Sequence, residues 1–244
     1  MLDLIGALLM GATLVAELAI LIGLAAIRPG ARLAAYVIAA VWVSIVFGIA
    51  AVGGFAPGAT GPFPPPVLAF LVLMISGIVA WSIWPSFRDA FLRLPLAALV
   101  GINAFRIGGA CFLILHNQGR LAAPFSTSAG WGDIITGIAA IPVAAMAASK
   151  GKLPRWLLTS WNAFGALDLI AAIALGALSA PGTPFHIFRD APGTLAMATI
   201  PWVGVPALHV PLFLMTHLAI AVRIRMTNRG QAITQQDFRA RRAA

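Results

Sequence analysis

Residues 4–27 read LIGALLMGATLVAELAILIGLAAI, and Glu17 is the only charged residue in this stretch. An α-helix rises about 1.5 Å per residue, so roughly 20 apolar residues cross a hydrocarbon core of about 30 Å. The stretch is too long, and alternates too little between polar and apolar residues, for a strand of a membrane β-barrel. It therefore predicts a transmembrane α-helix.

Further apolar blocks of similar length follow along the chain. The expected spans are residues 4–27, 33–56, 66–85, 94–115, 129–149, 156–178 and 202–223. The chain is 61% hydrophobic and 9% charged, whereas soluble domains carry about 25% charged residues. We therefore expect an all-α, polytopic transmembrane bundle of about seven spans, formed by a single domain over residues 1–224, and a basic tail over residues 225–244.

The basic residues predict the orientation of the bundle. Of the 16 lysines and arginines, thirteen lie in segments that would share one face of the membrane. They are Arg28, Arg32, Arg88, Arg93, Lys150, Lys152, Arg155, Arg223, Arg225, Arg229, Arg239, Arg241 and Arg242. Arg120 and Arg189 lie on the other side, so the positive-inside rule predicts an outside N-terminus and a cytoplasmic C-terminus. The first block is not a signal peptide, because its basic residues follow the apolar run. We expect a multi-pass protein of the cell membrane, in a bacterium the inner membrane.

The net charge of +9 does not indicate a nucleic-acid partner, because the basic residues flank the spans. The expected partners are the lipid bilayer and, at the basic tail, anionic lipids. A small-molecule or ion ligand in the bundle is also expected from the polar residues within the spans.

Ionisable residues within membrane spans are costly and often mark function. Here they are Glu17, Arg106, Asp133, Asp168, His209 and His217. Arg106 and Asp168 fall near the middle of their spans, so we predict that they pair across the bundle. Asp133 is the rival partner, about 7 Å further out by helical rise. A purely structural pair and a substrate or proton site remain equal alternatives.

Two uncharged polar residues add to this centre. Asn103 lies three residues before Arg106 and therefore on the same helix face. The tripeptide Asn103-Ala104-Phe105 recurs as Asn162-Ala163-Phe164, which hints at an internal repeat. The candidate substrate-binding residues are thus Asn103, Arg106, Asp133, Asn162, Asp168 and His209.

His209 is a candidate because of its neighbours. It lies between Pro206 and Pro211, and proline removes a backbone donor and kinks a helix. We predict that His209 borders a cavity that opens outward. A kinked helix whose histidine bonds to a neighbouring residue is the alternative.

Metal and cofactor chemistry has weak support. His209 and His217 are eight residues apart, or about 12 Å along a helix, too far to share one zinc ion. A site from His116, Asp133 and His209 is conceivable. Cys111 is the only cysteine, both lysines are outside the spans, and no nucleotide-binding glycine motif occurs. We expect no cofactor, retinal included.

The second half of the chain carries a resemblance. It rests on Arg106-x-Gly108-x-x-x-Phe112, Gly119-x-Leu121-x-x-Pro124, Ala129-Gly130-x-Gly132-Asp133, Trp161-Asn162 and Asp168. These residues resemble a family of uncharacterised bacterial seven-span membrane proteins, which implies the fold but no activity. The span number and orientation are also similar to membrane-embedded zinc hydrolases of the alkaline ceramidase type, but their paired histidines one turn apart are missing here.

The leading functional hypothesis is a transporter or permease-like protein for a small solute or proton. The alternatives are a membrane-embedded enzyme that uses His116, Asp133 and His209, and a sensor or assembly subunit whose polar pairs only hold helices together.

Overall fold

The computed structural model of the chain describes residues 1–149 and 153–243, with side chains described as far as Thr227. The described residues are helical, without strands. Seven helical segments are long and apolar enough to cross a membrane, as predicted. They are Leu2–Gly23, Pro29–Ala51, Pro65–Ile83, Leu96–Asn117, Phe125–Ala148, Arg155–Leu178 and Val205–Thr227. The protein is therefore a multi-pass membrane protein.

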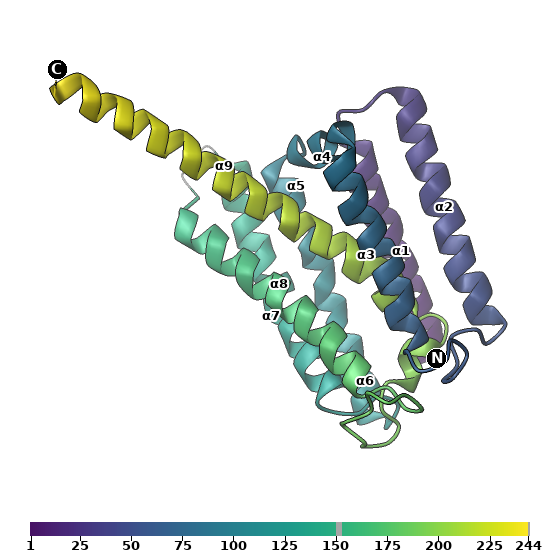
Figure 1. The fold of residues 1–244 in the computed structure, drawn as a ribbon. Helices are drawn as coiled ribbons and strands as arrows, with labels where there is room; N and C mark the ends of the chain where they lie inside the picture. Colours follow the sequence, from purple (N-terminus) through teal and green to yellow (C-terminus); the bar gives the residue numbers. More distant parts are fainter. Residues whose placement is uncertain (150–152, 244) are drawn as a thin grey trace.

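The first three spans are the single helices α1 (Leu2–Gly23), α2 (Pro29–Ala51) and α3 (Pro65–Ile83). Proline stands at the first position of α2, α3 and the short α4 (Pro85–Leu92). There its missing N–H breaks no helical hydrogen bond and its fixed φ suits the first turn. Figure 1 shows α2 at the edge of the bundle, beside α1.

The fourth span is built from three pieces: α5 (Leu96–Gly101), the 3₁₀ segment η1 (Ile102–Gly109) and α6 (Ala110–Asn117). The fifth and sixth spans are α7 (Phe125–Ala148) and α8 (Arg155–Leu178). α7 packs against η1, α5, α6 and α8, so these spans form one half of the bundle. A 3₁₀ segment in the middle of a span is unusual, and here it carries Arg106.

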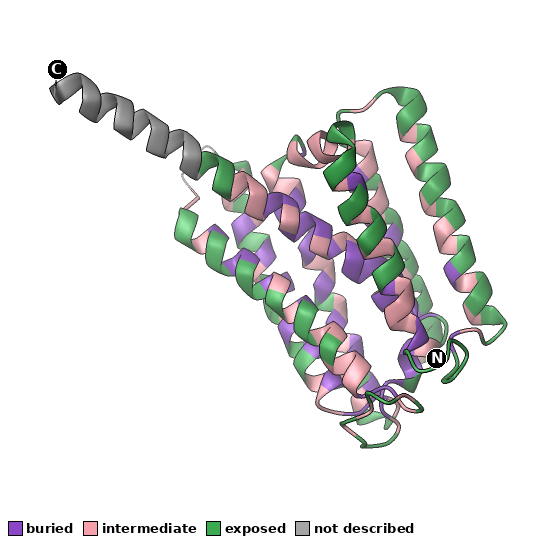
Figure 2. Ribbon diagram, in the orientation of Figure 1, coloured by how far each residue is buried: buried purple, intermediate pink, exposed green. Residues whose placement is uncertain are grey.

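The last span lies at the centre. It begins with a π-helical turn, η3 (Val205–His209), and continues as α9 (Val210–Ala243). In its most apolar stretch 72% of the residues are buried, whereas in that of α2 only 6% are buried. In Figure 2 the buried residues accordingly follow α9 between the two halves of the bundle, while α2 is mostly exposed. The last span connects the α1–α3 half to the α5–α8 half.

Loops close one end of the bundle. The segment between α8 and η3 includes the short 3₁₀ turn η2 (Leu195–Ala198), in which Ala196 and Met197 are buried. The Thr194 hydroxyl donates to the Gly176 carbonyl at 3.2 Å. This segment therefore packs onto the bundle and caps its end.

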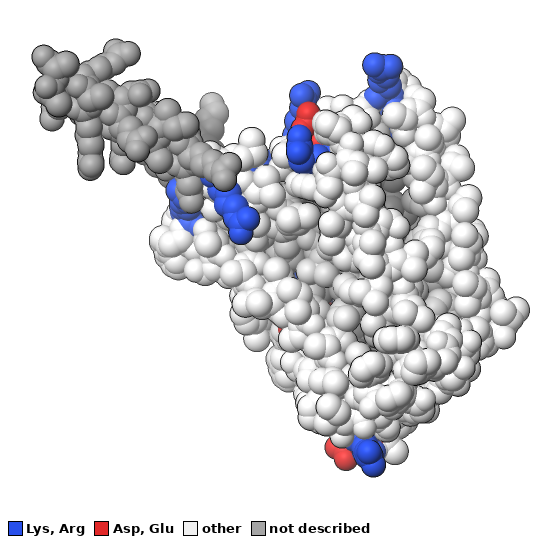
Figure 3. Space-filling view, in the orientation of Figure 1, with Lys and Arg blue, Asp and Glu red and all other residues white. Residues whose placement is uncertain are grey.

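Described basic side chains gather at the opposite end. Arg28 and Arg32 precede or begin α2, Arg88 and Arg93 lie at α4, and Arg223 and Arg225 lie at the end of the last span. Figure 3 shows these basic groups at the α4 end, with a smaller acidic and basic group at the other. Lys150 and Lys152 lie outside the described residues, and so do the side chains of the tail beyond Thr227, on which the anionic-lipid prediction rests.

Candidate functional site

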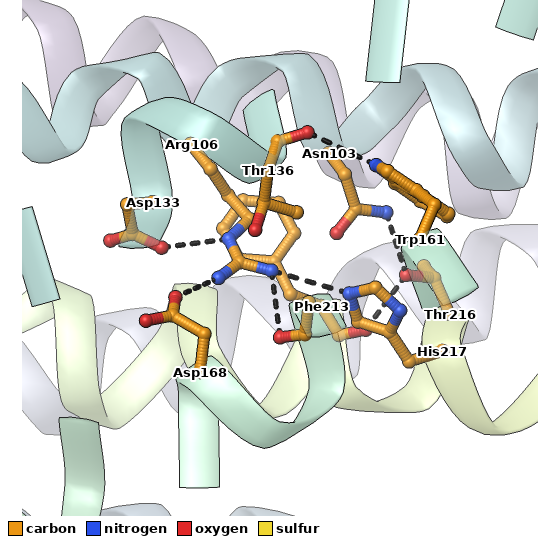
Figure 4. A network of polar contacts seen from close by, with 10 residues as sticks. Asn103, Arg106, Asp133, Thr136, Trp161, Asp168, Phe213, Thr216 and His217 are labelled. Atoms are coloured by element: carbon orange, nitrogen blue, oxygen red, sulfur yellow. Dashed lines mark hydrogen bonds and ion pairs between the residues drawn. The ribbon is translucent and has the colours of Figure 1, made fainter. Parts of the chain in front are cut away.

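Arg106 is the centre of a buried polar cluster inside the bundle. Its side chain is 0% exposed, and η1 places it between α7, α8 and α9. Its Nε donates to Asp133 Oδ1 at 2.7 Å, and its Nη2 donates to Asp168 Oδ2 at 2.5 Å. Its Nη1 donates to the Gly165 carbonyl at 3.0 Å. Figure 4 shows the guanidinium held from several sides by these partners.

The predicted pairing of Arg106 with Asp168 is thus confirmed, but Asp133 is a partner as well and not a rival. One cation therefore faces two carboxylates, whose side chains are 13% (Asp133) and 9% (Asp168) exposed. Taking such charges out of water is expensive unless they are paired and hydrogen-bonded. The guanidinium satisfies this rule, because it is both paired and hydrogen-bonded. The cluster as a whole does not balance, because one positive charge faces two negative charges.

His217 extends the cluster toward α8. Arg106 Nη1 lies 3.3 Å from His217 Nε2, and His217 Nδ1 lies 2.9 Å from Asn162 Oδ1. A guanidinium only donates, so Nε2 is the acceptor and Nδ1 carries the hydrogen that it donates to Asn162. The hydrogen bonds therefore assign His217 as a neutral Nδ1–H tautomer. The Trp161 ring packs against it, with centroids 5.3 Å apart.

Two asparagines, one in η1 and one in α8, form hydrogen bonds to consecutive residues of α9. Asn103 Nδ2 donates to Thr216 Oγ1 at 3.2 Å, and Asn162 Nδ2 donates to the His217 carbonyl at 3.3 Å. These are the asparagines of the recurring tripeptide. The similarity does not extend to the phenylalanines, because Phe164 is 45% exposed whereas Phe105 packs against the core.

Glycines allow the helices to approach closely enough for these contacts. A Cβ at Gly165 would lie 2.6 Å from His217 Cε1, and a Cβ at Gly132 would overlap the Asp168 carboxylate. At Gly130 it would lie 2.7 Å from Leu113 Cδ2. The sequence Gly130-Trp131-Gly132-Asp133 therefore does bring backbones together, as small residues commonly do between membrane helices.

Glu17 and His209 form a second buried polar site. Glu17 in α1 is 0% exposed, and His209 in η3 is 4% exposed. His209 Nδ1 lies 2.7 Å from Glu17 Oε1, while Glu17 Oε2 has no hydrogen-bond partner. The pair thus joins α1 to the start of the last span.

A small cavity of about 70 Å³ lies toward the loop-capped end. Its walls are largely apolar and come from α3, α8, η3 and the capping segment. Among the described residues that line it, Asp133 alone carries a charge. One carboxylate of the Arg106 cluster therefore meets this cavity.

The structure corrects the prediction for His209. Its neighbours Pro206 and Val210 line the cavity, but His209 does not. It turns to Glu17 instead, which matches the alternative of a kinked helix whose histidine bonds to a neighbour. The π-helical turn at this point is consistent with the irregular backbone that the prolines predict.

The weak metal alternative gains no support. His116 Nδ1 lies 3.0 Å from the Leu121 carbonyl and 3.1 Å from the Ser126 hydroxyl. Within the part of the chain that the structure describes, no three His, Cys, Asp or Glu side chains come together as metal ligands. His116, Asp133 and His209 therefore do not form a metal site there.

The other candidate residues, Asn103, Arg106, Asp133, Asn162 and Asp168, come together in one network. The sequence-based candidate set omitted His217, Thr216 and Gly165, which complete it. His217 was visible as an ionisable residue within a span, but its spacing from Asn162 gave no hint of contact. Gly165 carried one signal: it directly follows the second tripeptide, as Arg106 directly follows the first.

No curated protein and no solved structure matches this chain. The family described as domain of unknown function DUF8737 matches residues 64–225. That region contains the whole Arg106 cluster and His209, whereas Glu17, α1 and α2 precede it. Because the match covers most of the chain, the protein belongs to the DUF8737 family.

Proposed function

We propose that the protein is a proton-linked membrane carrier for a small solute, with Arg106, Asp133 and Asp168 as its proton site. The observation that carries the proposal is the charge of this cluster: two carboxylates share one guanidinium beside a cavity. His217 adds no positive charge, because its hydrogen bonds require the neutral form. An uncompensated charge at this depth is costly. One bound proton balances the cluster.

Asp133 is the group through which the proton exchanges. It lines the cavity, whereas Arg106 is fully enclosed. Asn103 Oδ1 and Thr136 Oγ1 are buried without a protein hydrogen-bond partner, and Figure 4 shows both side chains beside Arg106. Buried oxygens of this kind accept a hydrogen bond from a bound solute or water. The cluster therefore offers both a titrating group and acceptors.

The 3₁₀ segment gives the site a means of changing shape. η1 holds Arg106 with a hydrogen-bond geometry poorer than that of an α-helix. Gain or loss of the proton changes the force between the guanidinium and Asp133. A shift of η1 against α7 is the conformational step that we propose to couple proton binding to solute movement.

The proposed orientation has the N-terminus outside and the C-terminus in the cytoplasm, in the inner membrane of a bacterium. The support is the excess of arginine at the α4 end. The cavity at Asp133 then opens toward the outside. A reporter fused after Ala244 should be active only if it functions in the cytoplasm, and periplasmic activity would reverse the orientation.

The test is proton flux in liposomes that contain the purified protein and the pH-sensitive dye pyranine. A potassium diffusion potential drives protons inward, and the dye reports acidification. We expect faster acidification than in protein-free liposomes, and a loss of at least tenfold of this excess in Asp133→Asn. Trp131→Phe, two residues away and facing lipid at 58% exposure, is the matched control.

Equal rates for wild type, Asp133→Asn and empty liposomes would overturn the carrier proposal and leave the cluster as a structural link between spans. Flux that persists unchanged in Asp133→Asn would place the proton path elsewhere.

A further inference from the structure

We infer that a groove between α1, α2 and α3 binds an anionic diacyl phospholipid from the leaflet at the α4 end. The groove has a volume of about 1000 Å³ and lies on the other side of α9 from α7 and α8. It shares no residue with the cavity at Asp133. The inference does not depend on the proposed function.

The groove exists because α2 stands away from α3. α2 packs against α1, and Val46 is its only buried residue. The face of α2 toward the groove carries small side chains, Ala31, Ala34, Ala35 and Ala39, at helical spacing. Opposite them, Gly77 and Ala80 of α3 are equally small. Small residues on both walls leave a long apolar channel that side chains of the protein do not fill.

The length of the groove matches one leaflet. On α2 it runs from Ala31 to Val43, which is about 18 Å at the helical rise, and Arg28, the residue before α2, extends it toward the membrane surface. Half of the hydrocarbon core together with one headgroup layer is about 20 Å thick. The groove therefore begins at the membrane surface and ends near the middle of the bilayer, as an acyl chain does.

The charges lie at the end where a headgroup would lie. Arg28 and Arg93 line the mouth together with Asp89, and the deeper walls are apolar. Asp89 lies 4.0 Å from Arg93 and 4.0 Å from Arg88, which stands beside the mouth. Three arginines (Arg28, Arg88 and Arg93) against one aspartate leave this end of the groove with a net positive charge. Trp84 also lines this end, and tryptophan favours the headgroup level. A phosphate group with net negative charge suits this mouth.

A second copy of the chain fits this groove less well. Two copies in one membrane related by a two-fold axis meet at the same depth. Pairing through this face would bring Arg28 and Arg93 of one copy toward those of the other. A lipid instead brings the opposite charge.

The experiment is native mass spectrometry of the purified protein with added dioleoyl phosphatidylglycerol or dioleoyl phosphatidylcholine. We expect one retained phosphatidylglycerol per chain and weaker retention of phosphatidylcholine. Each basic contact at a membrane surface is worth about a fivefold change in affinity. Arg28→Gln/Arg93→Gln should therefore lower the affinity for phosphatidylglycerol by roughly 25-fold. Arg189→Gln, an exposed arginine at the far end, is the control and should have no effect.

A second variant tests the groove itself. Ala35→Trp should block retention of both lipids, whereas Ala40→Trp places the same bulk on α2 outside the groove and should not. If Ala35→Trp does not fold, the arginine variants decide, because both arginines are exposed. Equal retention of the two lipids, or no effect of the double arginine variant, would overturn the inference. So would a dimer that Ala35→Trp dissociates, because it would assign the groove to a second copy.

Discussion

The Arg106 cluster and the Glu17–His209 pair are both buried in the bundle, but they differ in how many of their polar atoms have hydrogen-bond partners. Every nitrogen of the Arg106 guanidinium has a partner, and these partners come from α7, α8 and α9. The pair has one hydrogen bond, and Glu17 Oε2 has none. The cluster lies wholly within the DUF8737 region, whereas Glu17 lies outside it. The cluster is therefore the part that we expect to carry both fold and function.

The largest effect should come from removing Arg106. Arg106→Ala leaves Asp133 and Asp168 buried without their cation, and stranding a buried charge costs about 3–5 kcal/mol. We expect little folded protein in detergent extracts, measured by fluorescence-detected size-exclusion chromatography. Wild-type yield would show that the cluster does not stabilise the bundle.

The same measurement distinguishes the contributions of Asp133 and Asp168 to the folded yield. Arg106→Ala/Asp168→Ala should recover only part of the yield, because Asp133 remains unpaired. Adding Asp133→Asn should recover more, since no buried charge then remains. If the double variant recovers as well as the triple, Asp133 contributes nothing to the balance of charge. If the losses simply add, Arg106 and Asp168 do not interact.

Removing one carboxylate should be milder than removing the arginine. In Asp168→Asn the guanidinium keeps one full partner in Asp133, and the asparagine oxygen still accepts. Hydrogen bonds to charged groups contribute about 1.5–3 kcal/mol, so we expect a loss of no more than about 3 kcal/mol. The thermal midpoint in detergent reports it. A loss as large as that of Arg106→Ala would contradict the charge excess on which the proton site rests.

Close packing at the cluster should respond to a single methyl group. In Gly165→Ala the new Cβ would lie 2.6 Å from His217 Cε1 and 2.8 Å from Thr136 Cγ2. Overpacking of this kind costs about 1–3 kcal/mol. Gly176→Ala on the same helix is the control, because its nearest atom would be Phe125 Cε2 at 3.4 Å. Equal thermal midpoints for the two variants would show that α8 moves away without cost.

The spans and their count follow from the sequence, because length and apolar composition alone decide whether a helix crosses a membrane. The sequence predicted the partners of Arg106 only in part: it favoured Asp168, whereas Asp133 is a partner as well. The estimate that Asp133 lies about 7 Å further out assumed a regular α-helix. Arg106 instead stands on a 3₁₀ segment, whose rise per residue is about 2.0 Å. The 3₁₀ segment packs against α7, and a single sequence reveals neither its geometry nor that contact.

The two histidines of the last span show the same limit. Both stand within one apolar helix, and the prolines near His209 favoured it as the site residue. In the structure His217 contacts Arg106, while Glu17, more than 190 residues away in sequence, binds His209. Depth and periodicity place a polar residue within a span, but the choice of partner depends on which helices are neighbours.

The smallest effect should come from Glu17→Gln. The glutamine keeps an oxygen that accepts from His209, and the position of Oε2 gains an amide nitrogen where the carboxylate had no partner. Removing a buried charge without removing its hydrogen bond should change stability by no more than about 1 kcal/mol. Proton flux should remain within twofold of wild type, because the proposed proton site is the Arg106 cluster.

Glu17→Leu is the matched variant: it leaves His209 unpaired and should lower the free energy of unfolding by more, about 1–3 kcal/mol. If Glu17→Gln abolishes flux while the thermal midpoint is unchanged, the pair belongs to the proton path. The separation between a structural pair and a functional cluster would then fail, and the last span, which carries both His209 and His217, would connect the two sites.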